Sequence, residues 1–178
     1  MVLTAARSCH SDFCRRVHAC LFTIFLLSLS GVGAFGMAED DARLRNRQGV
    51  LHAQRGDLLT AIRSFERARL ADPLDDTALT NLSCAHNNMG VLLCRDRRFT
   101  EAIAHFEKAK QHKPEDLQIR FNLLSALVLI RDAERVDIEA RGILALRPRD
   151  PETINKVANA FLKIEDDDSA RNLLERIL

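Results

Sequence analysis

Hydrophobic residues recur three and four positions apart in two segments that nearly repeat one another. The first covers residues 56–73 and reads GDLLTAIRSFERARLADP; the second covers residues 97–114 and reads RRFTEAIAHFEKAKQHKP. This spacing places the apolar side chains on one face of a helix. Each segment ends in a proline, Pro73 or Pro114, which stops a helix. The pattern predicts two amphipathic helices that bury the same face.

The same pattern continues toward the C-terminus at a spacing of 34 residues. The segment RDAERVDIEARGILALRP begins at Arg131, and EDDDSARNLLERIL begins at Glu165. A 34-residue period of helix, turn and helix predicts a solenoid, in which each unit buries its apolar face on the next. We therefore expect residues 39–178 to form one all-α domain.

These units resemble tetratricopeptide repeats, which carry a small residue at position eight, Ala at twenty, an aromatic at twenty-four and Pro at thirty-two. The units are residues 42–75, 83–116, 117–150 and 151–178, of which the first two match best. The residues at these positions are Gly49, Ala61, Phe65 and Pro73, then Gly90, Ala102, Phe106 and Pro114, then Leu124, Val136, Ala140 and Pro148, and finally Ala158, Ala170 and Leu174. The resemblance implies a right-handed α-solenoid.

Two features of the repeats lead to structural predictions. The glycines at position eight allow the paired helices to approach closely, and Phe65 and Phe106 fill the space beside them.

Seven extra residues, 76–82, separate the first two units. Because seven residues make about two helical turns, we expect one long helix over residues 77–95.

The first 38 residues differ in kind from the rest. No charged residue occurs in residues 17–38, and their most apolar part, ACLFTIFLLSL, follows Arg15 and Arg16. This is typical of a secretory signal peptide, whereas an uncleaved segment would be just long enough to anchor the chain in a membrane. Either reading predicts export, to the periplasm, the secretory lumen or the exterior, or attachment to a membrane through residues 17–38.

Composition and motifs argue against catalysis. The net charge of +1 gives no indication of nucleic-acid binding. His52, His86, His105 and His112 lack the spacing of metal ligands, so we expect no metal, no cofactor and no enzyme activity. The acidic run at residues 165–168 is typical of a solvated helix start.

Two other short motifs receive structural interpretations. The RGD sequence at residues 55–57 falls on the turn between paired helices, where Gly56 supplies a permissive backbone. Cys84 and Cys94 lie ten residues apart on one predicted helix, or about 15 Å. This is too far for a disulfide, so both should be free thiols, unless one of them pairs with a cysteine of another molecule.

The resemblance also implies a ligand site, because the first helices of tetratricopeptide units line a concave groove. The predicted groove residues are Arg47, Asn87, Asn88, Val91, Arg95, Asn122, Ser125, Asn155, Lys156 and Asn159. Other residues at concave-face positions include Gln118, Phe121, Val128 and Lys163. Asn88 and Asn122 occupy equivalent places and could pair with the backbone of an extended peptide, since an amide both donates and accepts. The basic residues favour an acidic segment.

We therefore expect a non-enzymatic scaffold that binds a peptide or protein segment, in the assembly of an envelope or secretory complex. One alternative is a homodimer formed through the apolar C-terminal edge, Leu173, Leu174, Ile177 and Leu178. Another is an accessory region of a larger enzyme.

Overall fold

The structure is a computed structural model that describes residues 39–147 and 149–175. A helix over residues 39–54 is followed by α2 (Leu58–Ala71), α3 (Asp76–Arg95), α4 (Phe99–His112), α5 (Leu117–Leu129), α6 (Ala133–Leu146), α7 (Pro151–Lys163) and α8 (Asp167–Leu174). The described residues contain no strand. The predictions for residues 17–38, Pro148, Ile177 and Leu178 lie outside the described residues.

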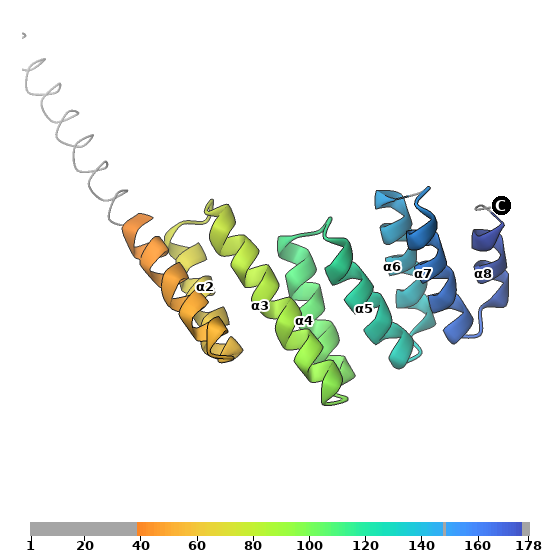
Figure 1. Ribbon diagram of the computed structural model, residues 1–178, viewed down its shortest axis with the longest axis horizontal. Coiled ribbons are helices and arrows are strands. Elements are labelled where there is room, and N and C mark those ends of the chain that lie inside the picture. The colour runs from red at the N-terminus through yellow and green to blue at the C-terminus, as the bar shows by residue number, and fades with distance from the viewer. Residues whose placement is uncertain (1–38, 148, 176–178) are drawn as a thin grey trace, which may run out of the picture.

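Consecutive helices pack in pairs, and the pairs stack side by side along an elongated array (Figure 1). The pairs are the 39–54 helix with α2, α3 with α4, α5 with α6, and α7 with α8. The first helices also meet one another, since α5 contacts both α3 and α7. Figure 1 shows α3, α5 and α7 in front of α4 and α6. The predicted all-α solenoid of helix-turn-helix units is confirmed.

The long helix predicted from the seven-residue insertion is present as α3. It contains 20 residues, begins at Asp76 and ends at Arg95, whereas α2 and α4 contain 14 each. Seven residues fall only about 20° short of two full turns. The extension therefore presents nearly the same faces to its neighbours at both ends of the helix.

A glycine faces a phenylalanine between the paired helices of the first two units. A Cβ atom on Gly49 would lie 2.5 Å from Cε1 of Phe65, whose side chain is buried. Gly90 and Phe106 repeat this contact, which confirms the packing expected from the sequence. In the third unit Leu124 and Ala140 occupy the equivalent positions, so the large side chain comes from the other helix; both are buried.

Each turn between the two helices of a pair contains one residue in the left-handed backbone region. Gly56 has φ 80°, as its predicted turn role requires. Arg97, Arg131 and Glu165 take the equivalent places, with φ of 61°, 54° and 68°. The next backbone N–H in each turn closes the helix end by bonding back to the preceding helix, as Arg98 N does to Leu93 O at 2.9 Å.

Aspartates cap the starts of most helices. Side chains of Asp57, Asp75, Asp116, Asp132 and Asp150 accept hydrogen bonds from backbone N–H groups in the first turns of α2, α3, α5, α6 and α7. Asp166 does the same for Ser169 N, so the acidic run at residues 165–168 leads into α8. Arg98 stands at the equivalent place before α4 without a side-chain cap.

A buried carboxylate joins three helices in the middle of the solenoid. Glu139 of α6 accepts from Lys110 Nζ of α4 at 2.5 Å and from Arg120 Nη1 of α5 at 2.8 Å. The Glu139 side chain is 4% exposed, so both partners compensate a charge that water does not reach.

Cys84 and Cys94 both lie on α3 and are free thiols, as predicted. At the C-terminal edge, Leu174 is exposed. Within the described residues, no helix combines the length and apolarity needed to cross a membrane.

Candidate peptide-binding groove

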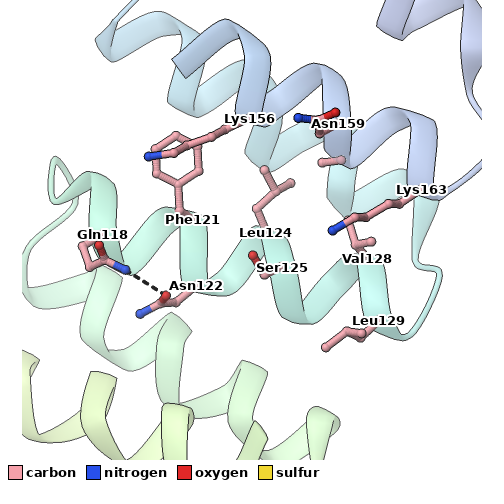
Figure 2. Close-up of a pocket in the computed structure, with 11 residues that line it drawn as sticks. Gln118, Phe121, Asn122, Leu124, Ser125, Val128, Leu129, Lys156, Asn159 and Lys163 are labelled. Carbon is pink, nitrogen blue, oxygen red and sulfur yellow. Dashed lines mark hydrogen bonds between the residues drawn. The ribbon is translucent and has the colours of Figure 1, made fainter. Parts of the chain in front are cut away.

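A hollow on the row of first helices lies between α5 and α7, and we call it the α5–α7 pocket. Its volume is about 540 Å³. Its lining residues are Gln118, Phe121, Asn122, Leu124, Ser125, Val128 and Leu129 from α5, and Lys156, Asn159, Ala160 and Lys163 from α7 (Figure 2). Four of the ten predicted groove residues, Asn122, Ser125, Lys156 and Asn159, meet in this pocket.

The floor of the pocket is apolar because α5 is apolar on more than one face. Leu123 and Leu127 of this helix are buried in the main core, together with Val136 of α6 and Phe161 of α7. Phe121 and Val128 are only partly buried and face the pocket (Figure 2). An apolar side chain of a ligand could therefore leave water by packing on this floor.

Two ammonium groups stand at the rim of the pocket. Lys156 Nζ lies 5.0 Å from the centroid of the Phe121 ring, within range of a cation–π interaction. It also donates to Glu152 Oε1 at 2.7 Å, although both side chains are largely exposed and such a pair is weak. Lys163 extends beside Val128 (Figure 2). The lining residues thus supply two ammonium groups and include no carboxylate.

The amide groups in and beside the pocket are linked to one another. Asn122 Nδ2 donates to Asn87 Oδ1 of α3 at 2.8 Å, and Asn122 Oδ1 accepts from Gln118 Nε2 at 3.0 Å. Asn81 Nδ2 likewise donates to Asn46 Oδ1 at 3.0 Å. Both asparagine pairs span 35 residues and connect successive first helices. Asn122 thus already holds two helices together.

Asn88 has different surroundings from Asn122. It is exposed and lines a smaller hollow of about 290 Å³ with Val50, Asn81 and Cys84. This hollow lies between the 39–54 helix and α3. The two asparagines are therefore not alike in their availability to a peptide, and their shared role remains a prediction.

The other predicted groove residues are dispersed. Arg47 lines a third hollow near the start of the 39–54 helix, together with Asp72 and Asp75. Val91 packs against the core, whereas Arg95 and Asn155 are exposed outside these three hollows. The ten residues thus lie along the row of first helices and do not form a single pocket.

Phe121 and Lys163, which also fall at concave-face positions of the repeat, supply the aromatic floor and the second ammonium. Leu129, which the repeat positions do not predict for the groove, adds an apolar wall. The signal for Leu129 was its spacing of four from Ser125, which puts both on one side of a helix. Within the described residues, no three His, Cys, Asp or Glu side chains are placed to hold a metal ion.

No protein-family model matches the chain, and no curated protein sequence matches it. Among solved structures it is similar to MamA of strain AMB-1, with 16% identity and a TM-score of 0.53 over 77% of this chain and 71% of that chain. A double mutant of MamA from strain RS-1 gives 16% identity and a TM-score of 0.52 over 78% and 74%. MamA of strain MSR-1 gives 16% identity and a TM-score of 0.50 over 77% of this chain and 75% of that chain.

Because the sequence identities to these structures are this low, the similarity is evidence for the fold and not for the function. MamA is a helical protein of the tetratricopeptide-like type. The paired helices, the glycine–phenylalanine contacts and the repeated turns of this chain lead to the same architecture. The described part of the chain is therefore an α-solenoid of tetratricopeptide-like helix-turn-helix units.

Proposed function

We propose that this protein is a non-enzymatic interaction scaffold that binds an extended, acidic segment of a partner protein along its first helices. The observation that carries this proposal is the α5–α7 pocket. It combines an apolar floor, three amide side chains and two lysines, with no carboxylate among its lining residues.

The pocket has a suitable size and chemistry for a few side chains of a peptide. Its volume of about 540 Å³ falls within the range of about 300–1,000 Å³ that is usual for ligand pockets. A ligand carboxylate would form charge-assisted hydrogen bonds with Lys156 and Lys163. An apolar side chain would pack on Phe121, and Asn159 could pair with the peptide backbone.

The cellular setting of the proposal rests on the sequence of residues 1–38. A signal peptide or anchor there favours export and a role in assembling an envelope or secretory complex. Exchange of this segment for a cytosolic sequence should abolish export, which fractionation of cells would measure.

The proposal can be tested by capture of partners from an extract of the native cells with the full-length chain as bait. The test variant is Lys156→Glu/Lys163→Glu. The matched control is Arg63→Glu/Arg67→Glu, which makes the same charge change at exposed positions of α2. We expect a partner that the wild type and the control retain and the pocket variant loses. Equal recovery by both variants would show that the pocket is not the site.

A second candidate is a homodimer formed through the C-terminal edge. It is favoured by the exposure of Leu174 on the last described helix. Light scattering should then report twice the monomer mass, reduced to the monomer mass in Leu174→Glu. A monomeric wild type would rule this candidate out.

A further inference from the structure

Three histidines that the sequence does not group into one site meet between α3 and α4. His86 of α3 is 3% exposed, and its Nδ1 lies 2.9 Å from Nδ1 of His105 of α4. The His112 ring, two turns further along α4, stacks on His86 with 6.5 Å between ring centroids and 16° between planes. His86 is thus held between two other imidazoles.

The cluster forms the polar half of the α3–α4 interface. In the other half, Leu93 of α3 belongs to the same core cluster as Ala102 and Phe106 of α4, and all three are buried. On the histidine side the buried Ser83 donates to Ala109 O at 2.9 Å. The three histidines are therefore titratable groups in the part of the interface opposite Leu93.

The contact between His86 and His105 requires a neutral ring. In a hydrogen bond between two Nδ1 atoms one nitrogen donates and the other accepts, whereas both nitrogens of a protonated imidazole donate. Double protonation would remove the bond and place two like charges at the same spot. The geometry of the contact therefore opposes protonation of both His86 and His105.

Burial acts in the same direction as the geometry. It lowers the pKa of His86 from 6.5 to about 4, assisted by the positive charges of His105, Lys108 and His112. Burial also lowers the pKa values of His105 and His112. Burial thus favours the neutral form of all three rings.

The surrounding charges come from three elements. On α4, Lys108 opposes and Glu101 favours protonation of His105. On α2, Arg69 opposes and Glu66 favours protonation of His112. At the end of the interface, Lys113 donates to Asp76 of α3 at 2.9 Å, but the Asp76 side chain is 81% exposed. The charges that act on His86 itself are all positive.

We propose that His86, His105 and His112 form a pH-sensitive seam, at which acidification detaches the C-terminal half of α4 from α3 while α5 to α8 stay packed. The direction follows from proton linkage. Between the unfolded pKa of 6.5 and the folded pKa of about 4, the open form binds more protons than the closed form. The stability of the seam is therefore full above pH 6.5 and falls as the pH decreases toward 4.

Hydrogen exchange of the full-length chain, measured by mass spectrometry at pH 7 and pH 5 and corrected for intrinsic exchange rates, tests the proposal. We expect local opening at residues 107–112 to increase on the order of tenfold at pH 5, with no such increase in α7. His86→Gln should abolish the difference between residues 107–112 and α7. His52→Gln, a histidine substitution outside the cluster, should leave it intact.

Several outcomes would overturn the proposal. These are an equal pH response in α4 and α7, a wild-type response in His86→Gln, or loss of the response in His52→Gln. If His86→Gln does not fold, NMR titration of the wild-type imidazole protons replaces it. His86 should stay neutral down to the pH at which α4 opens, and its protonation near pH 6.5 with α4 still protected would contradict the seam.

Discussion

A Cβ atom on Gly90 would lie 2.6 Å from Cε1 of Phe106, closer than carbon atoms can approach without displacement. Phe106 is 1% exposed, so its ring has no free space into which to move. The distance between α3 and α4 is thus set by the absence of a side chain at residue 90.

Gly90→Ala should therefore destabilise the protein even though Ala favours a helix. Overpacking costs about 1–3 kcal/mol, and the gain in helix propensity is about 1 kcal/mol. We expect a net loss of up to about 2 kcal/mol in the free energy of unfolding, measured by urea denaturation. Gly90→Ala/Phe106→Leu should recover part of it. A single variant as stable as the wild type would show that the helices can separate freely.

The left-handed turn residues predict a stabilising change. Arg97 has φ 61°, a conformation that costs a non-glycine residue about 1–2 kcal/mol, whereas the added freedom of glycine in the unfolded chain costs about 0.5–1 kcal/mol. Arg97→Gly should raise the free energy of unfolding by about 0.5–1 kcal/mol.

Two control substitutions should act in the opposite direction. Arg67→Gly, within α2, should destabilise by about 1 kcal/mol because the helical backbone there does not need glycine. Gly56→Ala should also destabilise, although a Cβ at that position would meet no atom within 4 Å. If Arg67→Gly also stabilised the protein, the effect of Arg97→Gly could not be attributed to the left-handed backbone conformation.

Glu139→Gln should be among the most damaging single substitutions, because it leaves Lys110 and Arg120 without their shared carboxylate. Loss of one partner of a buried ion pair costs about 3–5 kcal/mol. Because Lys110 and Arg120 are both partly exposed, we expect Glu139→Gln to lower the free energy of unfolding by about 2–3 kcal/mol, measured by thermal or chemical unfolding. Glu107→Gln, in the half-exposed pair with Arg135, should cost less than about 1 kcal/mol. Equal losses would show that burial of Glu139 is unimportant.

The repeat pattern predicted much of the fold because its period and its small residues have direct packing consequences. Gly49 and Gly90 are small where helices touch, and the insertion before residue 83 is close to two turns, so α3 could be foreseen. The left-handed conformations of Arg97 and Glu165 could not be foreseen from the residue types, because neither arginine nor glutamate favours that backbone region. Only their shared place in the repeat with Gly56 indicated it.

The candidate site was predicted less completely, because side-chain partners depend on helix rotation. Asn122 was grouped with Asn88 by repeat position, but it bonds to Asn87. The 35-residue spacing shared by both asparagine pairs was the available signal. His86 and His105 lie 19 residues apart on different helices, where no spacing rule applies.

The most direct test of the proposed function is a fluorescence anisotropy titration of the full-length chain with a labelled peptide of alternating Glu and Leu. We predict saturable binding that weakens with added salt, is at least about tenfold weaker in Lys156→Glu/Lys163→Glu, and is unchanged in Arg63→Glu/Arg67→Glu. Equal affinity in the pocket variant, or equally tight binding of a peptide of alternating Lys and Leu, would contradict the α5–α7 pocket as the site for an acidic segment.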